Sequence, residues 1–189
     1  MTEGPLFWYL NRATGIVLLV LLTASVVLGV LSMGGRPGKG LPRFVSQALH
    51  RNIALLSVLM LLAHVTTAVV DEYVDIRWWH ALVPVGATYE PLWLGLGTLS
   101  LDLMLAVTVT SLMRSRLGHR SWRTIHLLSW LAWASAASHS VGIGTDLADP
   151  GGLAVVPTAV CLAAVLAALG VRLAHGLRSV PSTTWERSA

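Results

Sequence analysis

The chain has 189 residues, of which 54% are hydrophobic and only 12% are charged. Soluble domains carry about 25% charged residues, so this composition argues against a soluble domain and favours a helical membrane protein, with one domain over residues 1–189. The net charge of +4 does not indicate nucleic-acid binding, because the basic residues stand at the edges of long apolar runs. The single cysteine, Cys161, excludes an intrachain disulfide and a CxxC metal site.

Five apolar segments are each near the roughly 20 residues that cross a bilayer. We predict membrane-spanning helices at about 13–33, 46–70, 93–113, 122–143 and 153–173. The first segment does not match a signal peptide, because it lacks a basic start and its apolar run exceeds the usual length of about 7–15 residues. The expected fold is therefore an all-α bundle of five transmembrane helices.

The charges of the connectors predict the orientation of the bundle. All but two of the 13 basic residues, Arg12 and Arg77, fall in or beside the first loop, the third loop and the C-terminal segment. By the positive-inside rule the N-terminus lies outside the cell membrane and the C-terminus is cytoplasmic. The longest connector, 71–92, then faces outward, and its segment IRWWHALVPV is too short to span, so we expect an interfacial helix or a cap.

Two of the predicted spans each contain two histidines, 14 residues apart in the second span and 13 apart in the fourth. Imidazole is costly in hydrocarbon, so histidines placed there indicate a functional site. Both spans run from inside to outside, and a rise of 1.5 Å per residue separates their histidines by about 21 and 20 Å. The histidines therefore match in depth. We call His50 and His126 the inner pair, and His64 and His139 the outer pair.

Two helices that offer imidazoles at two matching depths can hold two flat metal macrocycles between them. The spacing thus predicts two b-type haems between the second and fourth helices, one ligated by each pair. The free ring N–H of each ligand needs an acceptor, such as a backbone carbonyl or a Ser/Thr hydroxyl. One feature opposes this arrangement: 14 positions return within about 40° of the same helix face, whereas 13 positions miss it by about 140°. Tilt, tightening or a bulge in the fourth helix would be needed.

Arginines at the inner edge are candidates for contacts with haem propionates, since guanidinium binds carboxylate in a bidentate manner. Arg51 and Arg123, with Arg120, lie where inner propionates would emerge. The alternative is that these arginines only enforce topology. The acid inside a span, Asp102, could take up a proton or bind a quinone, or could simply contact a neighbouring helix.

The remaining candidates do not join the histidine pattern. We expect His80, His119 and His175 to be interfacial or solvated, and Cys161 to be a packing residue. Trp130 and Trp133 lie between the histidines of the fourth span, where they would either couple two haems or pack the bundle. The competing functions are a histidine-lined transporter or proton pathway, and a membrane anchor or scaffold for a flavoprotein.

The chain resembles the ferric reductase-like transmembrane family, which includes the membrane cores of NADPH oxidases, iron reductases and the haem subunit of bacterial methionine sulfoxide reductase systems. The resemblance rests on the 14- and 13-residue histidine spacings, the HR dipeptide at 50–51 and YLNRATG in the first span. It implies an iron-containing cytochrome b in which the inner and outer pairs bind inner and outer haems, and electrons pass from a cytoplasmic donor to an outer acceptor.

The sequence departs from the larger members of that family. It shows five predicted spans rather than six, and it has no GxGxxG motif and no soluble flavin or nicotinamide domain. We therefore expect a membrane subunit of an oxidoreductase, with no flavin or nicotinamide site of its own, that takes electrons from a separate flavoprotein or a quinol.

Overall fold

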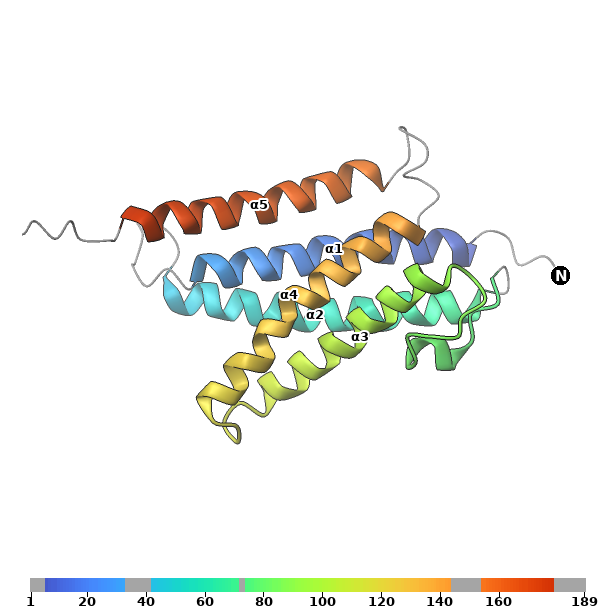
Figure 1. Cartoon of the computed structure of the whole chain (residues 1–189), viewed down its shortest axis with the longest axis horizontal. Helices are drawn as coiled ribbons and strands as arrows, with labels where there is room; N and C mark the ends of the chain where they lie inside the picture. Colours follow the sequence, from blue (N-terminus) through green and yellow to red (C-terminus); the bar gives the residue numbers. More distant parts are fainter. Residues whose placement is uncertain (1–5, 33–41, 72–73, 144–153, 179–189) are drawn as a thin grey trace, which may run out of the picture.

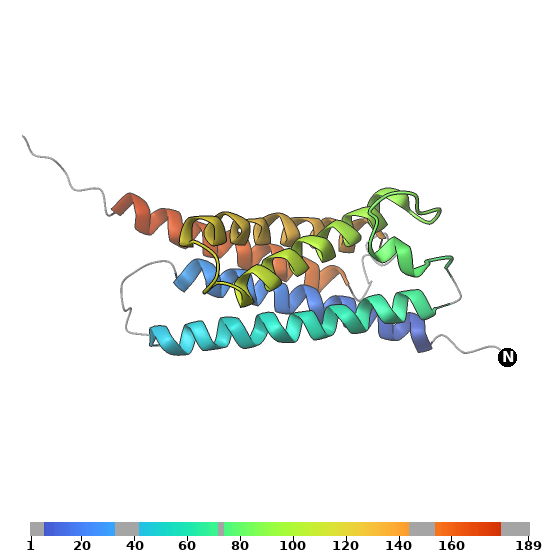
Figure 2. The ribbon, with the colours of Figure 1, turned by 90° about the horizontal axis from the view of Figure 1, so that it is seen from below.

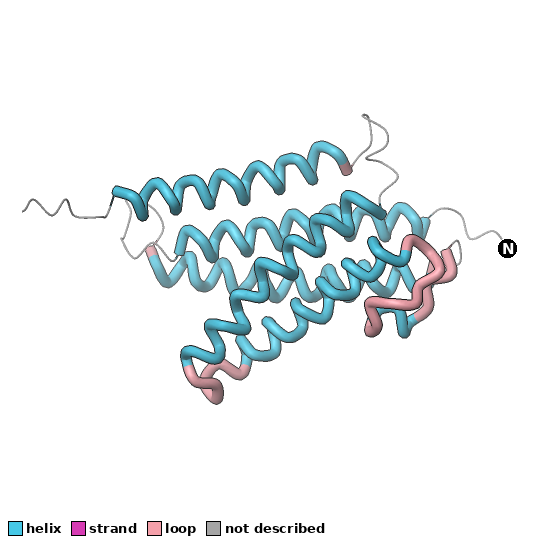
Figure 3. The backbone as a smooth tube through the Cα atoms, in the orientation of Figure 1, coloured by secondary structure: helices cyan, strands magenta, loops and turns pink. Residues whose placement is uncertain are grey.

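The computed structural model describes residues 6–32, 42–71, 74–143 and 154–178, and these residues form five α-helices and one 3-10 helix (Figure 1). The helices are α1 Leu6–Ser32, α2 Arg43–Val70, η1 Trp78–Ala81, α3 Pro91–Leu112, α4 His119–Ile143 and α5 Val155–Arg178. Within these ranges no strand occurs, and Figure 3 shows helices joined by short loops. The predicted all-α fold is confirmed.

The helices begin and end close to the predicted spans, and the largest difference is at the start of α1. This helix begins at Leu6, before the predicted residue 13, because the apolar and aromatic run LFWYL continues the helix ahead of Asn11 and Arg12. The start of α3 has a local cause, since Pro91 occupies the first turn, where its missing N–H costs no hydrogen bond.

Four of the described helices, α1, α2, α3 and α5, are long and apolar enough to cross a membrane. Helix α4 has 25 residues, or about 37 Å of helix, but its histidines and serines make it less apolar than the others. The chain is thus a multi-pass membrane protein. Because α4 packs against α3 throughout the bundle, we infer that its lower hydropathy reflects a polar face turned toward other helices.

The helices pack as two pairs, α1 with α2 and α3 with α4, while α5 lies against α1. Figures 1 and 2 show the α3–α4 pair running obliquely to the α1–α2 pair. Helices α2 and α4 make few direct contacts, although α1 touches α4 and links the two pairs. The second and fourth helices therefore face each other across the bundle without packing together.

An apolar cluster fills the middle of the bundle, where α1, α2, α3 and α4 meet. Its buried members are Leu18, Leu22, Leu61, Leu101, Met104 and Ala132. Large apolar side chains are also exposed on the outside of the bundle: Leu59 is 60% exposed, Val160 61% and Leu166 67%. Such extensive apolar exposure is unfavourable in water and fits contact with lipid.

The connector between α2 and α3 folds back onto the end of the bundle, as the predicted cap required. Its 3-10 helix contacts α3, and the hydroxyl of Thr98 donates a hydrogen bond of 2.5 Å to the carbonyl of His80. Gly95, which is also on α3, lies so close to the carbonyl oxygen of Pro84 that no side chain would fit between them. The cap is therefore attached to α3 at two points, one helical turn apart.

A glycine also sets the close packing of α3 against α4. A Cβ at Gly142 would overlap the indole of Trp93, whereas a Cβ at Gly170 of α5 would meet open space.

We predict that Gly142→Ala destabilises the protein by about 1–3 kcal/mol, because overpacking must move the indole of Trp93. Gly170→Ala is the matched control and should leave stability unchanged or raise it by up to about 1 kcal/mol, as alanine is the better helix former. Thermal unfolding in detergent measures both. Equal midpoints for the two variants would contradict the packing described for α3 and α4.

Candidate functional site

The structure brings the histidines of α2 and α4 together in two pairs. The ring centroids of His50 and His126 lie 6.2 Å apart, and those of His64 and His139 lie 6.4 Å apart. The ring planes are inclined by 69° in the inner pair and 83° in the outer pair. Two pairs, one residue in each from α2 and one from α4, thus share nearly the same separation and a nearly perpendicular arrangement.

The 13-residue spacing on α4 does not prevent this arrangement. Although the two positions differ by about 140° around an ideal helix, the rings of His126 and His139 both lie against α3, at Ser111 and Trp93 respectively. Helix α4 runs obliquely to α2 (Figure 1), so its two ends present different flanks toward α2. The described helix is continuous, without the bulge that the sequence allowed.

The histidines of α2 are held by α1. Nδ1 of His64 lies 3.1 Å from the carbonyl oxygen of Asn11, and Nδ1 of His50 lies 3.0 Å from that of Ser25. A carbonyl only accepts, so both Nδ1 atoms carry the proton. The hydroxyls of Thr14 and Ser25 lie 3.5 and 3.3 Å from the same two nitrogens.

The histidines of α4 are held in the same way by α3. Nδ1 of His139 donates to the carbonyl of Trp93 at 2.7 Å, and Nδ1 of His126 lies 3.4 Å from the hydroxyl of Ser111. The Nδ1 atoms of the four histidines therefore have partners, and Nε2 is the ring nitrogen left with a lone pair for a ligand. Metal-binding histidines are oriented by this kind of contact.

Small residues on α1 and α3 make room for the rings. A Cβ at Gly15 would lie 3.0 Å from Cε1 of His64, and a Cβ at Gly97 would lie 2.7 Å from Cε1 of His139. Gly29 faces His50 more loosely, at 3.8 Å. Gly15 and Gly29 are 14 positions apart, as are Gly97 and Ser111. Each supporting helix thus repeats the 14-residue spacing of α2.

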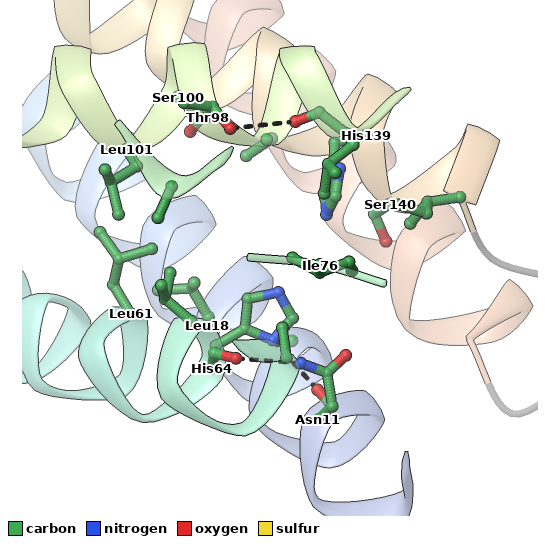
Figure 4. Close-up of a pocket in the computed structure, with 18 of the residues that line it drawn as sticks. Asn11, Leu18, Leu61, His64, Ile76, Thr98, Ser100, Leu101, His139 and Ser140 are labelled. Atoms are coloured by element: carbon green, nitrogen blue, oxygen red, sulfur yellow. Dashed lines mark hydrogen bonds between the residues drawn. The ribbon is translucent and has the colours of Figure 1, made fainter. Parts of the chain in front are cut away.

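A cavity of about 240 Å³ surrounds the outer pair. Figure 4 shows His64 and His139 directed toward it from opposite walls, with Leu18, Leu61 and Leu101 on its deeper side. The cap closes its other side with Ile76, His80 and Tyr89. The cavity is therefore mostly apolar, with two facing imidazoles and a few polar groups near the cap.

The residues around the inner pair differ from those around the outer pair. The indole of Trp122 stacks on the ring of His126, with centroids 5.1 Å apart and planes inclined by 26°, and the guanidinium of Arg114 lies 4.6 Å from the centre of the same indole. Arg51 and Arg123, expected near this pair, are exposed at the same end of the bundle. Arg114 is exposed as well, but it contacts the indole that stacks on His126.

Of the two environments expected for His80, interfacial or solvated, the structure excludes the solvated one, because the residue is only 6% exposed. The sequence suggested a surface loop, but Nδ1 of His80 accepts a hydrogen bond from the backbone N–H of Arg77, and Thr98 binds its carbonyl. His119 is exposed, as expected, and the side chain of His175 lies outside the described residues.

Of the other candidate residues, Trp133 and Cys161 have packing contacts. The indole N–H of Trp133 donates to the hydroxyl of Thr23 at 3.0 Å, and its ring packs on the central apolar cluster. Trp130 is half-buried, and Asp102 lies half-buried on α3. Cys161 is buried with Leu19 and Ala137, so the prediction of a packing role is confirmed.

Sequence reasoning missed the residues that hold the histidines, namely Asn11, Thr14, Gly15, Ser25, Gly29, Trp93, Gly97 and Ser111. A signal for six of the eight was available. Small residues 14 apart in the first and third spans repeat the histidine spacing, and Asn11, Thr14 and Gly15 all lie within the YLNRATG motif. A backbone carbonyl acceptor, by contrast, cannot be predicted from the sequence, because every residue type carries one.

These features define a class of protein: a multi-pass helical membrane protein with facing histidine pairs at two levels of its bundle. The family model described as "Ferric reductase like transmembrane component" matches residues 13–137, more than half of the chain. The chain therefore belongs to the ferric reductase-like transmembrane family, and this membership points to a membrane electron-transfer component. The match contains both α2 histidines and His126, and ends two residues before His139. No curated protein and no solved structure matches the chain.

We predict a graded response to alanine at the three glycines that contact histidine rings. Gly97→Ala should disturb the site most, Gly15→Ala less and Gly29→Ala least, following Cβ contacts of 2.7, 3.0 and 3.8 Å. The measurement is the haem b content per purified chain, haem being the cofactor expected from the sequence. A reversed order, with Gly29→Ala the most damaging, would contradict the described ring positions.

Proposed function

We propose that this chain is a membrane cytochrome b subunit that holds two haems, one between the imidazoles of each histidine pair, and passes electrons across the membrane. Membership of the family supports the proposal, because ferric reductase-like domains generally bind haem. Haem supplies the one-electron redox chemistry, while the protein binds it, orients its ligands and excludes water.

The observation that carries the proposal is the separation of the paired rings. A metal–nitrogen bond of about 2.0 Å on each side places the centroids of two opposed imidazoles roughly 6.2 Å apart. The observed 6.2 and 6.4 Å agree with this value in both pairs. Directly hydrogen-bonded or stacked imidazoles would lie closer together, so these separations favour one ion between the rings of each pair.

The protonation of the rings supports the same conclusion. Carbonyl acceptors hold Nδ1–H of His50, His64 and His139, so Nε2 of each is unprotonated when the ring is neutral. A neutral imidazole with a free Nε2 lone pair is the form that ligates haem iron. The buried lone pairs, which hydrocarbon would leave unsatisfied, are then used in bonds to iron.

The charges at the two ends of the bundle support a proposed orientation in the membrane. The turn after α3 carries Arg114 and the first turns of α4 carry Arg123, and both lie at the same end of the bundle as the start of α2, opposite the cap (Figure 1). By the positive-inside rule we place this arginine-rich end in the cytoplasm and the N-terminus outside, and we propose the cell membrane as the location. Electrons enter at the inner pair from a separate flavoprotein or quinol and leave at the outer pair.

The described residues support this path in two ways. The apolar cluster of Leu22, Leu61 and Met104 separates the two pairs and keeps water from the space between them. Fourteen residues of α2, about 21 Å, set the distance between the two levels. The protein thereby holds two redox sites in series across the thickness of the bilayer.

We predict that alanine at any of the four histidines removes about half of the bound haem. His50→Ala and His126→Ala should lose the same haem, and His64→Ala and His139→Ala the other, which the reduction potential of the remaining haem identifies. The measurement is a redox titration of purified protein monitored by absorbance.

His175→Ala is the control, because His175 belongs to α5, outside both histidine pairs, and its loss should leave both haems in place. Loss of the same haem from His50→Ala and His64→Ala would contradict the pairing. Retention of both haems in all four variants would exclude these histidines as ligands.

We also predict the spectroscopic class of both haems. Nearly perpendicular axial imidazoles leave two iron d orbitals close in energy, which gives a highly anisotropic low-spin signal in electron paramagnetic resonance. The ring planes here are inclined by 69° and 83°, so both oxidised haems should give such signals. Two ordinary rhombic signals would indicate parallel rings and contradict the described site.

A further inference from the structure

The indole nitrogen of Trp122 is buried and has no hydrogen-bond partner, the single such side-chain N or O atom found within the described ranges. Indole N–H is a donor only, and a buried donor without an acceptor is unfavourable. Trp133, further along α4, shows the usual solution, since its N–H donates to the hydroxyl of Thr23. The indole N–H of Trp122 therefore lacks an acceptor among the described residues, and a bound molecule could supply one.

The position of this donor is fixed by neighbours on two helices. The indole stacks on His126 of the inner pair at 5.1 Å, and the guanidinium of Arg114 lies 4.6 Å from its ring centre. Arg114 lies two positions beyond Leu112, the last residue of α3, and three positions after Ser111, whose hydroxyl lies beside the ring of His126. The chain just after α3 thus places a cation over the face of the indole whose edge carries the free donor.

A donor next to a permanent cation selects an anion as its acceptor. A carboxylate accepts a hydrogen bond from indole and interacts favourably with guanidinium. Within the described chain no carboxylate side chain contributes here, since the segment 103–143 contains no Asp or Glu. We infer that the anion comes from a bound molecule, because helices α1, α2 and α4 contain no Asp or Glu either.

We propose that Trp122 and Arg114 form the binding site for a carboxylate of the inner haem, with the indole N–H donating to it and Arg114 supplying the charge. The proposal rests on the proposed function. It assigns the inner carboxylate contact to Trp122, which stacks on His126, and to Arg114, which is exposed but contacts the indole, in place of Arg51 and Arg123. Phosphate of an anionic lipid offers similar chemistry, and the experiment below separates the two sources.

The test compares Trp122→Phe with wild type and with Trp8→Phe, all purified in a neutral detergent with both haems bound. Phenylalanine keeps the stacking on His126 but removes the N–H. Trp8 is the matched control, because Arg12 lies over its ring at 4.4 Å at the opposite end of the bundle. The readouts are the midpoint potential of the inner haem, identified by its absence in His50→Ala, and the carboxylate bands in redox-induced infrared difference spectra.

Trp122→Phe should lower the inner midpoint potential and shift a carboxylate band, because the oxidised haem is favoured when a hydrogen bond to its carboxylate is lost. Trp8→Phe should leave the inner haem unchanged. Arg114→Gln should lower the same potential further, and Arg114→Lys should restore much of it. If Trp122→Phe retains only one haem, the inner midpoint potentials of Arg114→Gln and Arg114→Lys test the proposal instead.

An inner potential and carboxylate spectrum that are the same in Trp122→Phe and wild type would overturn the proposal. A shift that appears only in bilayer discs containing anionic lipid, and never in neutral detergent, would assign the site to a lipid headgroup and also overturn it. These outcomes are distinct from failure of the proposed function, in which wild type itself carries no haem.

Discussion

The structure depends on how imidazole can be accommodated inside a membrane bundle. Each ring has two nitrogens, and hydrocarbon satisfies neither. Here Nδ1 of each ring has a hydrogen-bond partner on the helix behind it, which is α1 for the histidines of α2 and α3 for those of α4. The second nitrogen, Nε2, is left for a ligand, and the centres of the paired rings lie about 6 Å apart. The same contacts that make burial tolerable therefore also aim the rings.

This constraint explains the division of the bundle into two helix pairs. A helix that holds a histidine ring from behind must approach closely, and Gly15 and Gly97 permit that approach. The helices that carry the rings must stay apart, and α2 and α4 make few contacts. The apolar cluster in the middle and the cap at one end then complete a frame in which two levels of paired imidazoles are fixed by packing.

The sequence predicted the helical fold and the matching depth of the histidines, because hydropathy and residue spacing depend only on helix rise. It did not predict the partners of Nδ1, since a backbone carbonyl such as that of Trp93 can belong to any residue type. The expected strain from the 13-residue spacing was based on parallel ideal helices, whereas α4 runs obliquely to α2. The burial of His80 was not predicted, because it accompanies a hydrogen bond from Thr98, 18 positions away along the chain.

The central claim is that the facing imidazoles hold iron porphyrin at both levels, and the most direct measurement is the haem content of the purified wild-type chain. The protein should be expressed with ample haem supply, and the pyridine haemochrome spectrum should be compared with the protein concentration. We expect haem b at about two per chain, with a reduced-minus-oxidised spectrum typical of bis-histidine ligation. A folded, helical and colourless protein would contradict the account.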